Sequence, residues 1–335
     1  MNNLNTKKIL LFGGSSALLK IAKEIIKKKY ELMIFSETMH LNEEINDFGT
    51  LRDNLDKEGL AFSKINELSP KEIEGHITPN TIGLSISAVW IFKQDVIDLF
   101  EGRLYNIHAS VIPRGKGGGV YTWKILSQDH FGGFSIHKLE AGIDAGDVFM
   151  FKEFTFPLTC RIPKDYLAFA QEKEDKLLLA FLDAIESDDD LIPVPQNENF
   201  GTYWPRVNTE INGYVNWDWT ADEIELFINA FDDPYAGATT FLNGQKLRLK
   251  KGFKTQGEAS YHPFQYGIVY RIHNGHIFIA AKEGTIVLGE VYADDETEVF
   301  DKIKLGDRLY TPHSYLDQAR ARRIIYNAEG LQNKV

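Results

Sequence analysis

The sequence predicts an α/β fold, in which a Rossmann-like first domain with a mostly parallel sheet precedes a smaller, barrel-like β-rich domain. Three observations predict it. In the first half of the chain, short apolar runs alternate with amphipathic helical patterns. In the second half, short β segments bounded by glycines follow one another closely. Between them lies a stretch of acids and prolines. We therefore place a first domain at residues 1–190, a linker at 191–206 and a second domain at 207–335.

The first half of the chain repeats a strand–helix rhythm. A strand at Lys8–Phe12 leads through the turn Gly13-Gly14-Ser15-Ser16 into an amphipathic helix at Leu18–Lys29. Such a rhythm indicates an open parallel sheet with helices on both faces, which binds ligands outside the carboxyl ends of its strands. The elements expected to follow are strands at Leu32–Ser36, Ile82–Ser87, Leu104–His108, Phe134–Leu139 and Asp147–Phe156, and helices near Lys71–Gly75, from Lys93 and at Pro163–Ser187.

The second half has a different pattern. A helix at Ala221–Ala230 precedes several short segments of β character separated by glycines. Closely spaced short strands are typical of a small β-barrel or sandwich. The strands expected are Ala238–Leu242, Lys246–Lys251, Gly267–Ile272, His276–Ala281 and Gly284–Tyr292.

The amino-acid composition limits the cellular compartment and the classes of binding partner that we expect for this protein. The net charge of −11 over 335 residues argues against nucleic acid as a partner, although a small phosphorylated ligand remains compatible. The single cysteine, Cys160, forms no internal disulfide, which favours the cytoplasm. No apolar run reaches the length of a membrane span. The acidic runs Asp188–Asp190 and Asp294–Glu296 are expected to be solvated loops, so we expect no metal site. The oligomeric state stays open, with a homodimer among the alternatives.

Three polar side chains point to a reaction centre. Asn106 and His108 lie two apart at the end of a predicted strand, so they project from the same face. Asp144 lies in a glycine-punctuated acidic loop between two later strands. An amide and an imidazolium can stabilise an oxyanion, and a carboxylate can orient the imidazole as it relays a proton. This set suits the attack of an amine on a formyl carbon. Taken singly, each residue is also compatible with an ordinary loop position.

The sequence motifs around these residues point to a particular protein family. Asn106-Ile107-His108-Ala109-Ser110, then Pro113-Arg114-Gly115, then Gly142-Ile143-Asp144-Ala145-Gly146-Asp147 resembles the signature of the 10-formyltetrahydrofolate-dependent formyltransferases. The resemblance covers about the first 200 residues well. It implies 10-formyltetrahydrofolate as co-substrate and Asn106, His108 and Asp144 as the catalytic trio. It also implies that the pterin is held mainly by backbone groups, near Trp90, Ile91, Phe92, Leu139, Gly142 and Ile143.

Within this family, the sequence is most similar to the nucleotide-sugar N-formyltransferases. Members of that branch formylate dTDP-linked 3-amino- or 4-amino-dideoxysugars for O-antigen or lipopolysaccharide synthesis. The residues that carry the likeness, and that we expect to bind the acceptor, are Arg114, Gly117, Gly118, Gly119, Tyr121, Trp123, Tyr203, Trp204 and Arg206. Two structural alternatives stand beside this interpretation. Tyr121 and Trp123 can face the core, and the segment Tyr203–Arg206 can form an aromatic hinge between the domains.

Three other functions were weighed. Methionyl-tRNA formyltransferase is the alternative within the family, but the second domain holds 14 Lys and Arg against 18 Asp and Glu, which fits RNA poorly. A dehydrogenase needs the pattern G-x-G-x-x-G after its first strand, and Gly13-Gly14-Ser15-Ser16 lacks it. A folate-binding module without activity is disfavoured by the intact set of Asn106, His108 and Asp144.

Overall fold

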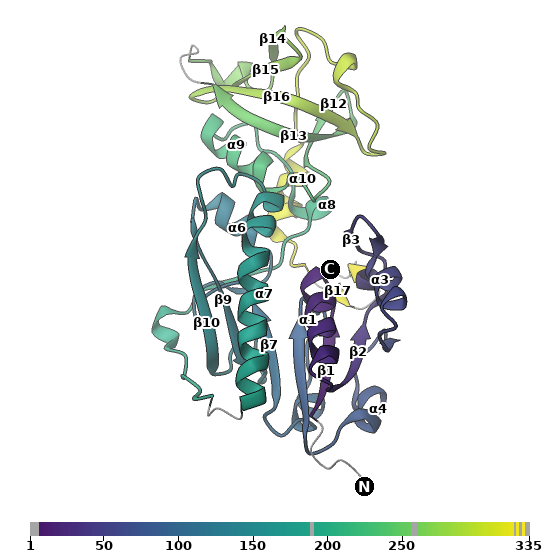
Figure 1. Ribbon diagram of the computed structural model, residues 1–335. Helices are drawn as coiled ribbons and strands as arrows, with labels where there is room; N and C mark the ends of the chain where they lie inside the picture. The colour runs from purple at the N-terminus through teal and green to yellow at the C-terminus, as the bar shows by residue number, and fades with distance from the viewer. Residues whose placement is uncertain (1–6, 188–190, 256–259, 325, 328–329, 332–335) are drawn as a thin grey trace.

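The computed structural model describes residues 7–187, 191–255, 260–324, 326–327 and 330–331. The acidic run Asp188–Asp190 lies outside the described residues. An α/β domain forms the lower part of the molecule and a β-rich domain the upper part (Figure 1). Within the described ranges, no helix combines the length and the apolar composition needed to cross a membrane.

A seven-stranded sheet forms the centre of the first domain, in the order β10-β9-β7-β6-β1-β2-β5. The five strands from β5 to β7 are parallel, and β9 and β10 are antiparallel to their neighbours, so the prediction of a mostly parallel sheet is confirmed. The strands are β1 (Lys8–Gly13), β2 (Glu31–Ser36), β5 (Phe62–Lys64), β6 (Thr81–Ile86), β7 (Leu104–His108), β9 (Phe131–Lys138) and β10 (Val148–Thr155).

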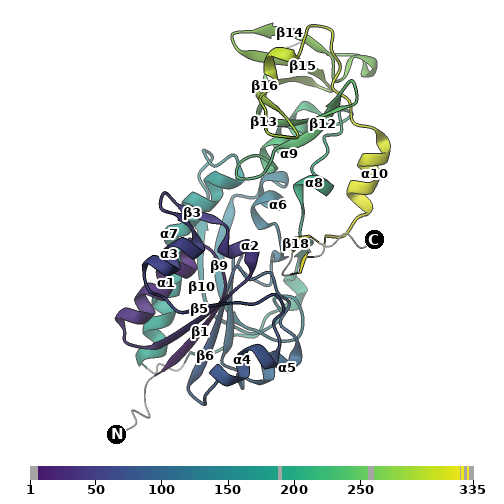
Figure 2. The same cartoon turned by 90° about the vertical axis from the view of Figure 1, so that its right-hand side faces the viewer.

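Each face of this sheet has its own apolar core, because alternate residues of a strand point to opposite sides. On β1, Ile9 and Leu11 belong to one core while Leu10 and Phe12 belong to the other. The first core lies under α1, α3 and α7, and the second under α4 and α5 (Figure 2). These helices are α1 (Ser16–Lys27), α3 (Leu51–Lys57), α4 (Pro70–Ile73), α5 (Gln94–Asp98) and α7 (Pro163–Ser187). Smaller elements between them are α2 (Thr38–Leu41), β3 (Glu44–Asn46) and β4 (Gly49–Thr50).

The strand order reverses its direction beside β1. The chain builds outward from β1 to β2 and β5, then returns to the other side of β1 to form β6 and β7. Loops that follow β1 and β6 therefore diverge, which is where open α/β sheets hold ligands. The first turn is tied to the opposite loop, since Gly14 N donates to Ile86 O at 3.1 Å. His108 ends β7 on the same edge of the sheet.

The second domain contains a five-stranded antiparallel sheet in the order β12-β13-β16-β15-β14. Residues 307–310 bridge its two edge strands, through the pairs Phe241–Tyr310 and Ile268–Arg308, so the sheet closes into the predicted barrel-like form. The elements are α8 (Thr209–Asn212), α9 (Ala221–Ala230), β12 (Ala238–Leu242), β13 (Gln245–Thr255), β14 (Val269–His273), β15 (His276–Ala281), β16 (Gly284–Ala293) and α10 (His313–Ala321). The chain then returns toward the first domain with β17 (Tyr326–Asn327) and β18 (Gly330–Leu331) (Figures 1 and 2).

The segment predicted as a linker is bonded along the first domain. Val194 pairs with Val148 beside β10. Further on, β11 (Tyr203–Trp204) runs parallel to β8 (Lys116–Gly117), which precedes α6 (Val120–Leu126). These two short strands were not expected from the sequence, because each is two residues long and its partner lies far away in the chain. They bring the interdomain segment to the loop that follows β7.

Candidate active site

The three polar residues singled out in the sequence lie together at the carboxyl edge of the sheet. His108 Nδ1 is 3.6 Å from Asp144 Oδ2, although 36 positions separate the two residues in the chain. Asn106 joins them through His137, whose Nε2 lies 3.1 Å from Asn106 Nδ2 and 3.5 Å from Asp144 Oδ1. The cluster therefore contains four side chains.

His137 is the member of this cluster that the sequence analysis missed. It is almost completely buried, and it lies on β9 directly opposite Asn106 of β7. Its Nδ1 faces the Lys138 carbonyl at 2.9 Å, so Nδ1 carries the proton and Nε2 accepts from the Asn106 amide. A histidine at the end of a predicted strand was the available signal, but its importance depends on the register between β9 and β7.

Asp144 is held as a carboxylate. Its side chain is 13% exposed, and it accepts the Gly117 N–H at 2.8 Å. Burial by itself would raise the pKa of Asp144. The positive charge of His108 and the hydrogen bond from the Gly117 N–H outweigh that effect and hold this pKa well below its ordinary value. His108 donates its Nε2 proton to Gly115 O at 2.8 Å, so its Nδ1 faces the carboxylate.

Close packing explains why glycine occupies positions 117 to 119. Gly117 has a φ of +96°, and a Cβ there would lie 2.2 Å from the carbonyl oxygen of Trp204. A Cβ on Gly118 would lie 3.0 Å from Arg206, and Gly119, with a φ of +68°, precedes α6. The sequence led us to expect close approach of a ligand at these glycines. What approaches them closely in the structure is the chain's own segment around β11.

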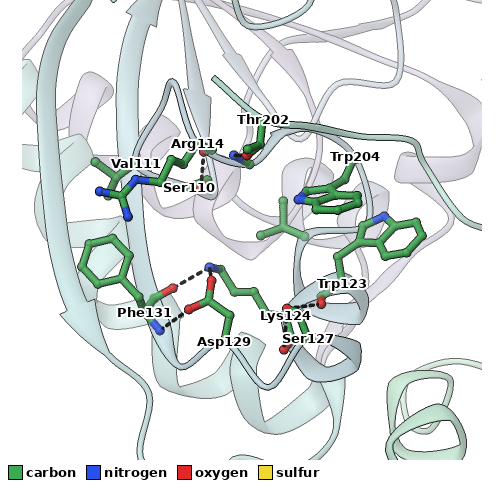
Figure 3. Close-up of a pocket in the computed structure, with 13 residues that line it drawn as sticks. Ser110, Val111, Arg114, Trp123, Lys124, Ser127, Asp129, Phe131, Thr202 and Trp204 are labelled. Carbon is green, nitrogen blue, oxygen red and sulfur yellow. Dashed lines mark hydrogen bonds and ion pairs between the residues drawn. The ribbon is translucent and has the colours of Figure 1, made fainter. Parts of the chain in front are cut away.

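Four of the expected acceptor-binding residues meet in one pocket (Figure 3). Trp123 and Trp204 stack with their ring centroids 5.4 Å apart, and Trp123 Nε1 donates to Pro205 O at 2.8 Å. Arg114 lies on another wall, with its guanidinium 5.8 Å from the centre of the Phe131 ring. The lining residues are Ser110, Val111, Arg114, Gly115, Gly118, Val120, Trp123, Lys124, Ser127, Asp129, Phe131, Thr202 and Trp204. Gly115 lines the pocket and also contacts His108 of the polar cluster, so it lies at the boundary between the two.

The other expected acceptor-binding residues lie elsewhere. Tyr121 packs against Phe156 and Tyr166, each with ring centroids 6.0 Å away, so its ring belongs to the core as in the structural alternative. Tyr203 is half exposed beside Gly117. Arg206 lies against Gly118, and its charge reaches Glu37, a fully buried carboxyl at the end of β2. Glu37 also accepts the Val89 N–H at 3.1 Å, so this position lies beside the segment that follows β6.

The six residues expected to hold the pterin divide into two kinds. Trp90 and Leu139 are partly buried and pack on the core that includes Phe92, so these two segments share one apolar wall. The side chain of Phe92 is itself buried in that core, which leaves only its backbone for a ligand. Ile91 and Ile143 are 79% and 46% exposed, and Gly142 is exposed with a φ of +119°. The indole N–H of Trp90 is buried and has no hydrogen-bond partner among the described residues.

A metal site is not found in the part of the chain that the structure describes. No group of three His, Cys, Asp or Glu side chains there is arranged to hold a metal ion. The cluster of Asn106, His108, His137 and Asp144 is instead suited to proton transfer and to stabilising a negative charge on oxygen.

Comparison with known proteins divides the chain into the same two parts. Residues 8–161 match the family described as formyl transferase, and residues 209–299 match formyl transferase, C-terminal domain. A methionyl-tRNA formyltransferase from Cereibacter sphaeroides is 30% identical over 236 residues, which cover 68% of this chain and 74% of that protein. Another, from Bdellovibrio bacteriovorus, is 26% identical over 258 residues, covering 73% and 78%.

The fold is also similar to solved structures. An N-formyltransferase from Helicobacter canadensis, in complex with folinic acid and dTDP-3-aminofucose, superposes with a TM-score of 0.64. The two sequences are 17% identical, and the match covers 86% of this chain and 100% of the other. At that identity the likeness concerns the fold.

Proposed function

The chain belongs to the formyltransferase family, and from this premise we propose that it transfers a formyl group from 10-formyltetrahydrofolate to the amine of a nucleotide-linked amino-dideoxysugar. The acceptor proposed is a dTDP-linked 3-amino or 4-amino sugar used for O-antigen or other surface polysaccharides. One observation carries the transfer chemistry. A buried carboxylate, Asp144, faces His108 and His137, and Asn106 completes the cluster.

The residues present fit a folate. The pterin is a flat, apolar-faced ring with hydrogen-bonding edges, which suits the wall formed by Trp90 and Leu139 and the backbone beside it. The unpartnered indole N–H of Trp90 is a donor available in that region. We propose that the segments Trp90–Phe92 and Leu139–Ile143 hold the ring. When bound, 10-formyltetrahydrofolate supplies an electrophilic formyl carbon that leaves N10 as the acceptor nitrogen bonds to it, while one proton passes from that nitrogen to N10.

The side chains of the cluster divide the remaining work. Asn106 Nδ2 carries two hydrogens and uses one toward His137, so the second is available to an oxyanion. His108 in its cationic form stabilises the same charge and can move the proton. Asp144 stabilises that cation, and because the pKa of Asp144 is far below its usual range, it stays ionised throughout the neutral pH range.

Two features support a nucleotide-sugar as the acceptor. The net charge of −11 and the excess of acids in the second domain oppose the approach of a large RNA. The pocket beside the cluster joins stacked indoles, from Trp123 and Trp204, to the guanidinium of Arg114, and this pairing suits a ring attached to a phosphate. Methionyl-tRNA formylation is the second candidate, favoured by the names of the two relatives from Cereibacter sphaeroides and Bdellovibrio bacteriovorus.

A competition assay separates the two acceptors. The protein is given 10-formyltetrahydrofolate with a dTDP-4-amino or dTDP-3-amino sugar, and separately with initiator methionyl-tRNA, at physiological salt. We expect formylated sugar by mass spectrometry and no formyl-methionyl-tRNA. Formylation of the tRNA at a rate equal to or above that of the sugar would overturn the proposed acceptor.

A pair of substitutions tests the pocket. Trp204→Ala should raise the KM for the sugar acceptor about tenfold or more, because stacking on an aromatic ring contributes on the order of 1–3 kcal/mol. Phe264→Ala is the control, since Phe264 is an exposed aromatic on the second domain that does not line the pocket. Equal KM values in both variants would exclude this pocket from acceptor binding.

A further inference from the structure

The segment between the domains is hydrogen-bonded to the loop that carries Asp144 through the side chain of Gln196. The amide of Gln196 donates to two backbone carbonyls of the loop between β9 and β10. Gln196 Nε2 is 2.8 Å from the oxygen of Asp144 and 2.6 Å from the oxygen of Gly146. Both hydrogens of the amide nitrogen are used by these bonds. The carbonyl oxygen of the same amide is buried without a hydrogen-bond partner in the described residues, so the orientation of Gln196 is determined by its donor end.

The loop needs such support because its conformation is unfavourable for the residue it carries. Asp144 has a φ of +48°, and the left-handed region costs a residue with a Cβ roughly 1–2 kcal/mol. The loop is also tightly packed against the end of β9, since a Cβ on Gly146 would lie 2.0 Å from the carbonyl oxygen of Lys138. The two bonds from Gln196 lie on either side of Ala145 and hold the turn in this shape.

Further along, the same segment supports the other half of the catalytic pair. Thr202 Oγ1 accepts the Gly115 N–H at 2.8 Å, and Thr202 O accepts the Lys116 N–H at 2.9 Å. Gly115 is the residue whose carbonyl receives the proton of His108. Residues 196–204 therefore contact the backbone of two segments: the loop that carries Asp144, and the loop after β7 whose Gly115 carbonyl binds His108.

We propose that Gln196 is a positioning residue, which holds the turn at Asp144 so that its carboxylate stays against His108 and His137. The expected effect on the rate rests on the proposed formyl transfer. The contacts of Gln196 do not depend on the identity of the substrate. A displaced carboxylate lowers the rate of the chemical step without removing any contact to the acceptor. A misplacement of about 1 Å in a catalytic group costs up to about 100-fold in rate.

Three variants test the proposal. Gln196→Met keeps the length of the side chain and removes both donor hydrogens. Gln196→Lys restores a donor that is long enough to reach both carbonyls. Asn197→Ala is the matched control from the same segment, because the Asn197 side chain accepts only from Asn199 N, outside the catalytic loops. Kinetics with the sugar acceptor and a carbon-13 NMR titration of the Asp144 carboxyl are measured for each.

For Gln196→Met we expect kcat to fall about 10- to 100-fold with KM values within about twofold, and the pKa of Asp144 to rise toward its ordinary value. Gln196→Lys should recover part of kcat, and Asn197→Ala should behave as wild type. An unchanged kcat, an unchanged Asp144 titration, or a lysine variant as slow as the methionine variant would each overturn the proposal. If Gln196→Met does not fold, Gln196→Asn, which is one methylene shorter, is judged by the same criteria. A wild-type protein that formylates no acceptor would refute the proposed function alone, because the Asp144 titration still tests the positioning role.

Discussion

Replacing Asp144 by asparagine tests the catalytic cluster with little change in shape. The substitution removes one negative charge 3.6 Å from His108 Nδ1 and 3.5 Å from His137 Nε2. The asparagine carbonyl can still accept the Gly117 N–H that Asp144 now accepts at 2.8 Å. We therefore expect Asp144→Asn to fold normally and to lose the stabilisation of the cationic form of His108.

The expected loss follows from the strength of that interaction. Removing one partner of a buried ion pair costs about 3–5 kcal/mol, and every 1.36 kcal/mol changes a rate tenfold. Loss of the charge that faces His108 should therefore lower kcat by on the order of 10²–10³-fold. The KM for the acceptor should stay within about threefold, since Asp144 faces the two histidines and the backbone. Steady-state kinetics at saturating 10-formyltetrahydrofolate measures both, and a thermal melt establishes that the variant is folded.

A pH series gives a second, independent measurement. Because the pKa of Asp144 is lowered in the folded protein, its ionisation stabilises the fold above the unfolded pKa of about 3.9. That stabilisation disappears as the pH falls through the folded value. Between pH 5 and pH 2, wild type should lose more unfolding free energy than Asp144→Asn. A variant with normal kcat and only a raised acceptor KM would refute the catalytic role and assign Asp144 to substrate binding.

Three further predictions concern other positions. Asn106→Ala and His108→Ala should each lower kcat by on the order of 10²–10³-fold in a folded protein, and near-normal turnover in either would remove that residue from the mechanism. Gly117→Ala should reduce both kcat and stability to urea, because its Cβ would lie 2.2 Å from a carbonyl oxygen of β11. Gly244→Ala is the control, since Gly244 also has a positive φ but has open space around it, and this variant should lose only about 1–2 kcal/mol of unfolding free energy. Equal losses in the two variants would contradict the prediction. Burial raises the pKa of Glu174 to about 7, so the native state holds a proton that the unfolded chain releases near pH 4.3. The free energy of unfolding should therefore fall from pH 5 to pH 8. Glu174→Gln removes this fall and should be about 1–3 kcal/mol more stable than wild type at pH 8, as measured by urea unfolding. An unaltered pH dependence in the variant would show that Glu174 is not the group responsible.

The regular elements of the fold were accessible from local patterns. The apolar run at Lys8–Phe12 became β1, and the long stripe from Pro163 became α7, because burial of one face or both faces imposes a period that is visible in the sequence. Short elements were not accessible. The pair β8–β11 has two residues on each side, and its hydrogen bonds join Lys116 to Thr202 across 86 positions. No local period announces such a pairing.

The same division applies to the site. A spacing of two on a strand places Asn106 and His108 on one face, so their proximity follows from strand geometry alone. The role of His137 depends on the register of β9 against β7, which the sequence does not contain. For Tyr121 the sequence left a ligand contact and a core-facing ring as alternatives, and in the structure its ring packs against Phe156.

What the sequence determined by itself was the class of the fold, the family and the acidic character that disfavours RNA, and it also supplied the prediction that Asn106, His108 and Asp144 form a reaction centre. Those properties arise from composition, from periods of two and 3.6 residues, and from short motifs, all of which act within a few positions. Only the tertiary structure decided that Gln196 and Thr202 of the interdomain segment contact the loops that carry Asp144 and His108. Contacts of this kind join residues 52 and 87 positions apart. They exist because the chain between the two domains runs along the loops after β7 and β9, where its backbone pairs with β8.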